Sequence, residues 1–243
     1  MPNGIAVDKQ GRLKERAAIT DTTLLLTITV VVFFLLYLAA ILFLGGSFTK
    51  PQNFLNILNN NASLIVLSCG MSIVMVTGGI DISVGGVTCL VCMTCALNLE
   101  QQGGNMMTVI LIGLGIGLAF GVVQGFLVAH LGIQPFIVSL AGMFFAKGMT
   151  TIVSKEPVRV TNEGFLAVKD MRINVPGLGA PNKLGVYIPA YVEVGVVVAL
   201  VVVVLLFCLL RWTRLGRAFY AVGGSNQSAN MLGINVRRTK FLA

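Results

Sequence analysis

The chain contains a series of long apolar runs that carry almost no charge, and these runs limit the folds that it can adopt. The first run, residues 22–44, has no Asp, Glu, Lys or Arg. A helix of this length, rising about 1.5 Å per residue, spans the roughly 30 Å hydrocarbon core of a bilayer. Hydrophobic residues make up 56% of the 243 residues and charged residues only 11%, whereas soluble domains have about 45–50% and about 25%. The sequence therefore predicts a membrane protein with several spans, and it excludes a soluble globular enzyme or a disordered chain.

Six apolar segments lie along the chain, and we expect each to form a helix in the membrane. They cover residues 22–44, 62–79, 84–97, 106–129, 135–153 and 189–210. The second and third are short for a complete crossing and meet at the sequence GGIDISVGG. Residues 45–61, with Pro51 and a run of Asn, and residues 154–188, with Pro157 and the sequences PGLG and APN, predict loops outside the bilayer. The predicted fold is all-α, with about six transmembrane helices.

Basic residues gather at the two ends of the chain, outside the apolar segments. The tail, residues 1–21, has four of them, and residues 211–240 have six and no acidic residue. Because cytoplasmic segments are enriched in Lys and Arg, and an even number of crossings returns the chain to its starting side, we expect both ends in the cytoplasm. Residues 154–188 are then outside, although they include five basic residues. This grouping accounts for the net charge of +8, so we expect no nucleic-acid partner.

Asp81 is the most informative single residue, because it stands among glycines between two short apolar segments. A carboxylate near hydrocarbon is costly unless it faces water or a partner, and interrupted helices often build transport sites. The alternative is that Asp81 lies at the membrane surface and caps the next helix. We assign a substrate pathway or gate to the polar and glycine residues of this motif and to one amide after the fourth segment: Thr77, Gly78, Gly79, Asp81, Ser83, Gly85 and Gln134.

Other motifs predict packing rather than chemistry. Glycine recurs at every fourth residue from Gly113 to Gly125, which favours close helix–helix contact. The cysteines at 89, 92 and 95 lack the remaining ligands of an iron–sulfur run, and His130 is the only histidine. The sequence has no Ser-His-Asp set, Walker loop or paired carboxylates. We therefore expect no catalytic residue, no metal site and no cofactor.

Residues 213–240 form a basic segment with a distinct internal pattern. Gly223 and Gly224 are followed by SNQSANML and then by Gly233, which predicts a short helix with a polar start and a glycine stop. Such a helix at the cytoplasmic surface could lie in a groove of another protein. The alternative is an ordinary basic loop that only sets the orientation of the chain.

At these two motifs the sequence resembles the permease subunits of bacterial ABC importers for simple sugars, of the ribose, arabinose and galactofuranose type. The resemblance covers nearly the whole chain, in order, through NILNNNASLIVLSCGMSIVMVTGGIDISVGG, GIQPFIVSLAGMFFAKGM, and TRLGRAFYAVGG to GINVRR. The stretch LAGMFFAKGM followed by VSKEP is most similar to furanose-importing members. Members have roughly ten helices, so the chain would correspond to their N-terminal part, with a truncated seventh span starting at residues 241–243.

The resemblance implies a permease without enzymatic activity, in the bacterial inner membrane, with membrane lipid around it. ATP would be hydrolysed by a separate ATP-binding subunit, and a periplasmic or lipid-anchored protein would deliver the sugar. A second permease subunit would complete the membrane domain, residues 22–210. The resemblance also implies that residues 211–240 couple the permease to the ATP-binding subunit, through Gly223, Gly224, Ser225, Asn226, Ala229, Leu232, Gly233 and Ile234.

Two other classes of function stay open from the residues themselves. One is a secondary transporter or channel in which Asp81 binds a proton or cation. The other is a membrane-anchored assembly subunit that does not transport. An ATP-binding partner at residues 213–240 would distinguish an importer from both.

Overall fold

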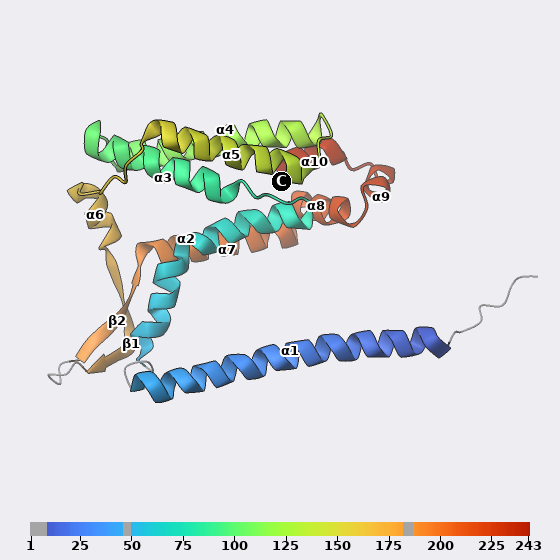
Figure 1. Ribbon diagram of the computed structural model, residues 1–243, viewed down its shortest axis with the longest axis horizontal. Coiled ribbons are helices and arrows are strands. Elements are labelled where there is room, and N and C mark those ends of the chain that lie inside the picture. Colours follow the sequence, from blue (N-terminus) through green and yellow to red (C-terminus); the bar gives the residue numbers. More distant parts are fainter. Residues whose placement is uncertain (1–8, 46–49, 182–186) are drawn as a thin grey trace, which may run out of the picture.

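The computed structural model describes residues 9–45, 50–181 and 187–243, and most of these residues are helical (Figure 1). The elements in chain order are α1 (Lys9–Leu44), α2 (Pro51–Val76), α3 (Val84–Gln101), α4 (Met106–Ala129), α5 (Pro135–Val153), α6 (Glu163–Lys169), β1 (Arg172–Pro181), β2 (Tyr187–Glu193), α7 (Val194–Trp212), α8 (Arg214–Gly224), α9 (Asn226–Met231) and α10 (Val236–Leu242). Six of these helices, α1 to α5 and α7, are long and apolar enough to cross a membrane. The expected six-span helical fold is confirmed.

The helices after α1 form two layers (Figure 1). One layer contains α3, α4 and α5, and the other contains α2 and α7 side by side. Small residues allow the close packing within each layer. A Cβ added at Gly86 on α3 would lie 2.9 Å from the carbonyl oxygen of Met143 on α5, and the buried Ala62, Val196 and Ala199 form the contact between α2 and α7.

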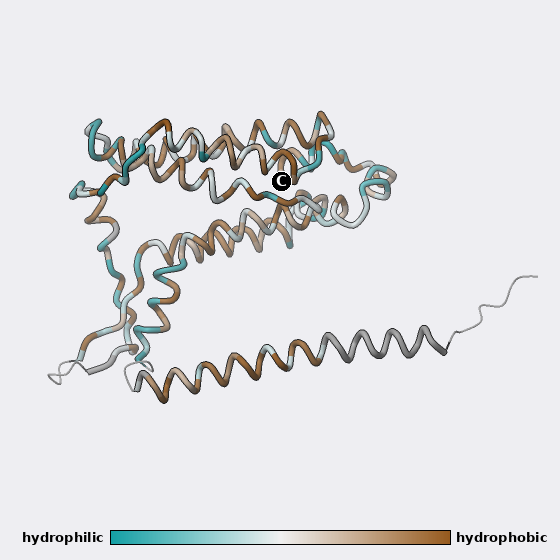
Figure 2. The backbone as a smooth tube through the Cα atoms, viewed as in Figure 1, coloured by the Kyte–Doolittle hydropathy of each residue, from teal (hydrophilic) through white to brown (hydrophobic). Residues whose placement is uncertain are grey.

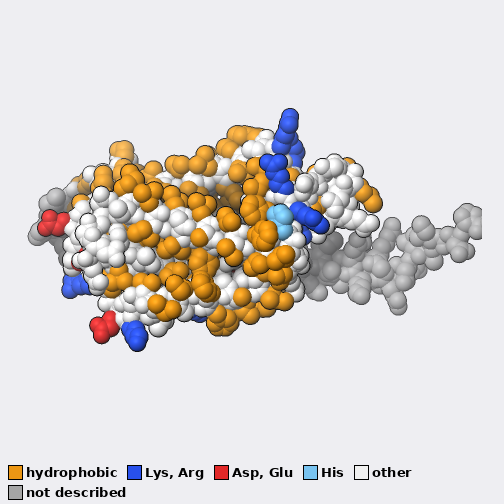
Figure 3. Space-filling model, turned by 90° about the horizontal axis from the view of Figure 1, so that it is seen from above, with side chains coloured by type: hydrophobic (Ala, Val, Ile, Leu, Met, Phe, Trp, Pro, Cys, Tyr) orange, Lys and Arg blue, Asp and Glu red, His pale blue; other side chains and the backbone are white. Residues whose placement is uncertain are grey.

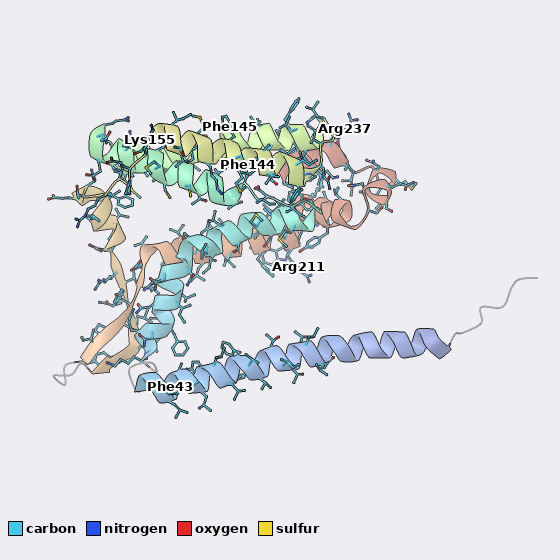
Figure 4. All side chains as sticks on the ribbon, in the orientation of Figure 1. Phe43, Phe144, Phe145, Lys155, Arg211 and Arg237 are labelled. Atoms are coloured by element: carbon cyan, nitrogen blue, oxygen red, sulfur yellow. The ribbon has the colours of Figure 1, made fainter. Side chains whose placement is uncertain are left out.

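The outer faces of the spans are apolar and exposed. Figure 2 shows hydrophobic stretches along the helices and polar stretches mainly at their ends. Phe144 and Phe145 on α5 (Figure 4) are 63% and 62% exposed, and Leu205 on α7 is 63% exposed. Apolar surface of this extent is not stable in water, so we assign these faces to the interior of the membrane.

The two ends of the bundle carry different structures. The short helix α6 and the β1–β2 hairpin lie at one end, and α8 and α9 lie at the other (Figure 1). Lys155 is at the hairpin end, whereas Arg211 and Arg237 are at the α8–α9 end (Figure 4). Of the tail expected at residues 1–21, residues 9–21 continue α1 as helix, and residues 1–8 lie outside the described residues.

The β1–β2 hairpin lies where the sequence predicted a plain loop. β1 and β2 pair antiparallel from Arg172 opposite Glu193 to Pro181 opposite Tyr187, with a register shift between Val175 and Gly179. The sequence PGLG, which helped to predict a plain loop, lies within β1 at this irregularity. Because β2 extends to Glu193, the sixth span begins at Val194 and not at residue 189. Residues 182–186 of the predicted loop lie outside the described residues.

The start of α2 also differs from the prediction. Pro51, taken as a loop signal, is at the first turn of the helix, a position where its missing N–H costs no hydrogen bond. The Asn run continues the helix, and the side chain of Asn61 donates to the carbonyl of Ile57 at 2.7 Å. α2 therefore has 26 residues, long enough to cross completely. Asp81 thus lies between two helices that are each long and apolar enough to cross a membrane.

Candidate functional site

Residues 77–83 connect α2 to α3 through a tight turn that holds Asp81. Gly78 has a φ of +80°, a conformation that a residue with a side chain rarely adopts. The Oδ1 atom of Asp81 accepts hydrogen bonds from the backbone N–H of Ser83 at 2.8 Å and from its hydroxyl at 2.6 Å. This is an Asx-type turn, in which a side chain replaces a backbone acceptor two residues away. The carboxylate is therefore held in place by its own segment.

A polar contact extends from this turn to α4. The Nε2 group of Gln124 donates to the Ser83 hydroxyl at 3.0 Å, so the hydroxyl accepts from Gln124 while it donates to Asp81. Ser83 is only 2% exposed. Gly142 on α5 leaves room for the Gln124 amide, because a Cβ there would collide with Nε2. In a buried setting such a chain of hydrogen bonds orients each of its members.

A cavity of about 370 Å³ opens beside this turn. Its walls come from the end of α2, from α4, from the start of α5 and from residues 240–243, and Figure 1 shows the C-terminal end of the chain between the two layers. The lining is mostly apolar, including Gly117, Gly121 and Gly125 of the predicted packing ridge. Its polar side chains are Thr77, Asp81, Gln124, Ser139 and Lys240. A few polar groups in an apolar cavity can orient a small polar solute.

The structure brings part of the predicted pathway together. Thr77, Gly78, Gly79 and Asp81 line the cavity, and Ser83 lies behind Asp81. Gly85 is exposed in the first turn of α3, and Gln134 is an exposed residue that precedes α5; neither lines the cavity. The Asp81 acceptor bonds reach Ser83, the residue that precedes α3, and no side chain caps the first turn of this helix.

The predicted pathway did not include Gln124 or Ser139. The Ser139 hydroxyl lies 3.2 Å from the carbonyl oxygen of Ile80, and so links α5 to the turn. The only available signal was a polar residue within an apolar helix, which often marks an interhelical contact. The pairing of Gln124 with Ser83 could be found only from the tertiary structure, because the two residues are 41 positions apart in the sequence.

The second predicted site, at the α8–α9 end, has the expected short helix. The Ser225 hydroxyl accepts from the N–H of Ser228, which caps the start of α9. Gly233 has a φ of +77°, its N–H bonds to the carbonyl of Asn230, and the N–H of Ile234 bonds to the carbonyl of Ala229. This pair of bonds is a Schellman motif, so the predicted glycine stop is confirmed.

Individual residues of this segment lie differently from the expectation. Ala229 is 0% exposed, so it packs inside the chain and cannot face a partner, whereas Met231 and Leu232 are 78% and 76% exposed. Gly224, Ser225 and Asn226 are exposed. Gly223 lies against the end of α2, where an added Cβ would collide with the carbonyl oxygen of Val76. The end of α8 therefore packs against the end of α2, next to the turn that holds Asp81.

The fold and the site define a multi-pass membrane protein that holds a partly polar cavity between its helices. The sequence profile of the family described as "Branched-chain amino acid transport system / permease component" matches residues 53–243. The chain belongs to this family, which is one of transport permeases and not of enzymes.

Similar proteins include several named sugar permeases. The fructose import permease protein FruG of Bifidobacterium longum is 32% identical over 91% of this chain and 64% of its own length. The inner membrane ABC transporter permease protein YjfF of Escherichia coli is 34% identical over 88% of this chain and 61% of its own length. The ribose import permease protein RbsC of E. coli is 32% identical over 86% of this chain and 61% of its own length. The chain thus spans about three fifths of these relatives, and no solved structure matches it significantly.

Proposed function

We propose that the chain acts as the permease subunit of an ATP-driven ABC importer that brings a simple sugar across a bacterial inner membrane. The observation that carries this proposal is the similarity to fructose and ribose import permeases over 86–91% of the chain. The family description mentions branched-chain amino acids. The named relatives favour a sugar, and the hydroxyl, amide and carboxylate groups at the cavity are suited to hydrogen bonds with sugar hydroxyls.

In this proposal the turn around Asp81 lines or gates the sugar pathway. The Oδ1 atom of Asp81 is engaged by Ser83, and among the described residues its second carboxylate oxygen has no hydrogen-bond partner. Asp81 also lines the cavity. That oxygen can therefore accept a hydrogen bond from a sugar without loss of the turn.

Coupling to ATP hydrolysis is proposed to occur at α9. Met231 and Leu232 expose an apolar pair at the tip of the α8–α9 end, which suits a groove on a separate ATP-binding subunit. Movement of α9 would reach the cavity through α8, because Gly223 touches the backbone of α2 next to Thr77. This orientation places residues 211–240 in the cytoplasm, as the basic residues favour.

The other proposed partners follow from this orientation. The α6–hairpin end would face a periplasmic or lipid-anchored sugar-binding protein, and a second permease subunit would pack against the exposed spans.

Copurification from native membranes tests this proposal. A tag on this chain should recover an ATP-binding subunit, and Leu232→Glu should lower its recovery at least about fivefold, because a charge at an apolar contact weakens binding. Ile188→Glu is the matched control: Ile188 is 51% exposed, but on the hairpin at the opposite end. Equal recovery with all three proteins would contradict a contact at α9.

A further inference from the structure

A second cavity lies at the end of α4, apart from the one that contains Asp81. Its volume is about 400 Å³, and it is lined by His130, Asn235, Arg237, Arg238 and Phe241. The His130 ring stacks on Phe126 at 5.1 Å between centroids and meets the edge of Phe241 at 5.8 Å. The cavity therefore combines an aromatic wall, held by ring contacts, with two arginines.

The charge at this cavity is positive and is not balanced by its surroundings. The cavity is lined by residues at the end of α4 and on α10, and neither helix contains Asp or Glu. The sequence has no acidic residue from 194 to 243. Arg237 and Arg238 are exposed. The Asn235 side chain accepts from the N–H of Arg238 at 2.9 Å, which fixes the backbone that carries both guanidinium groups. The cavity is thus suited to an anion, and arginine favours phosphate oxygens.

The position of the cavity indicates the source of that anion. Figure 3 shows the pale-blue histidine and blue basic side chains at one end of a face whose middle is largely hydrophobic. Phe126, Leu131 and Leu242 near this cavity are 49%, 59% and 47% exposed. A free phosphate gains nothing from adjacent apolar surface, whereas a phospholipid can place its headgroup at the arginines and its acyl chains along the helices.

We infer that this cavity binds the phosphate headgroup of an anionic phospholipid. The same end of the bundle carries Arg211 (Figure 4), so the site belongs to the more basic end of the protein. Basic pockets between membrane helices at the cytoplasmic surface bind anionic headgroups in this way. The inference concerns the lipid around the protein and does not depend on the transported substrate.

Lipid titration of the purified full chain in mild detergent tests the inference, with bound lipid counted by native mass spectrometry. Phosphatidylglycerol should bind more tightly than phosphatidylcholine, and Arg237→Gln/Arg238→Gln should weaken phosphatidylglycerol binding at least about fivefold. Arg211→Gln/Arg214→Gln removes the same charge from exposed positions outside the cavity and should change binding less than about twofold. Millimolar inorganic phosphate should not displace the lipid.

A charge-preserving variant separates binding from folding. Arg237→Lys/Arg238→Lys should keep the preference for phosphatidylglycerol, so a loss in the Gln variant alone identifies the charge as the cause. Equal weakening by the cavity variant and the control variant would overturn the site, since it would show diffuse attraction only. Displacement by inorganic phosphate would also overturn it, in favour of a free-anion site.

Discussion

Asp81 is held by Ser83, its neighbour in the sequence, and Ser83 is in turn held by the distant Gln124. The turn that binds its Oδ1 atom lies within GGIDISVGG, so the motif could be predicted to bend the chain and hold a carboxylate. The contact between Ser83 and Gln124 could not be predicted, because it depends on how α4 packs against residues 77–83. Gln134 was chosen for its place near the exit of α4, and the structure leaves it exposed instead.

Asp81→Asn tests the charge of this residue. Asn can still accept from the Ser83 amide through its Oδ1 atom, so the turn and the amount of protein in the membrane should be unchanged. Sugar uptake should fall at least about tenfold, because the charged acceptor is lost. Asp170→Asn, an exposed position at the end of α6, is the control for the loss of one carboxylate and should leave the amount of protein in the membrane unchanged. Normal uptake by Asp81→Asn with reduced membrane levels would favour a purely structural cap.

The α8–α9 segment shows which features of an element are encoded locally. Its helix start at Ser225 and its glycine stop at Gly233 were both predicted, because capping depends on residues within one turn. The burial of Ala229 and the contact of Gly223 with α2 were not, since both depend on distant elements. A small residue such as Ala229 can pack either against its own chain or against a partner protein. Its position in the sequence does not distinguish the two.

Gly223→Ala tests the junction of α8 and α2. The new methyl group would meet the Val76 carbonyl, so the helices must separate, at a cost of about 1–3 kcal/mol. The apparent Tm in detergent should fall by on the order of 5 °C. Gly224→Ala is a close control, because nothing lies within 4 Å of its added Cβ. Indistinguishable Tm values for the two variants would mean that the junction does not contribute to stability.

At the scale of the whole molecule, the apolar runs predicted the number of spans, and the hairpin was missed. The six spans can be predicted because the length and hydropathy of each segment are properties of that segment alone. The β1–β2 pair has Pro and Gly inside its first strand and lacks the alternation that marks a strand. The contact between the hairpin and α2 could not be predicted either. The side-chain oxygen of Gln52 on α2 accepts a hydrogen bond from the N–H of Tyr191 on β2 at 2.8 Å, and the two residues are 139 positions apart in the sequence.

Accessibility labelling tests the orientation. Cysteines introduced at Glu163 on α6 and Arg217 on α8 lie at opposite ends of the bundle. An impermeant maleimide should label Glu163→Cys in intact cells and Arg217→Cys only after permeabilisation, because the more basic end stays inside. The native chain, with its five free cysteines, gives the background. Labelling of both positions from the same side would rule out the six-span topology.

Uptake by the purified complex tests whether this chain belongs to an ATP-driven sugar importer. The complex recovered through a tag on this chain would be reconstituted into vesicles with ATP on the side of α9, together with its sugar-binding protein. We predict that radiolabelled pentose or hexose accumulates only when ATP is present, and that a proton gradient has no effect. Accumulation that follows the proton gradient without ATP, or uptake of branched-chain amino acids and of no sugar, would contradict it.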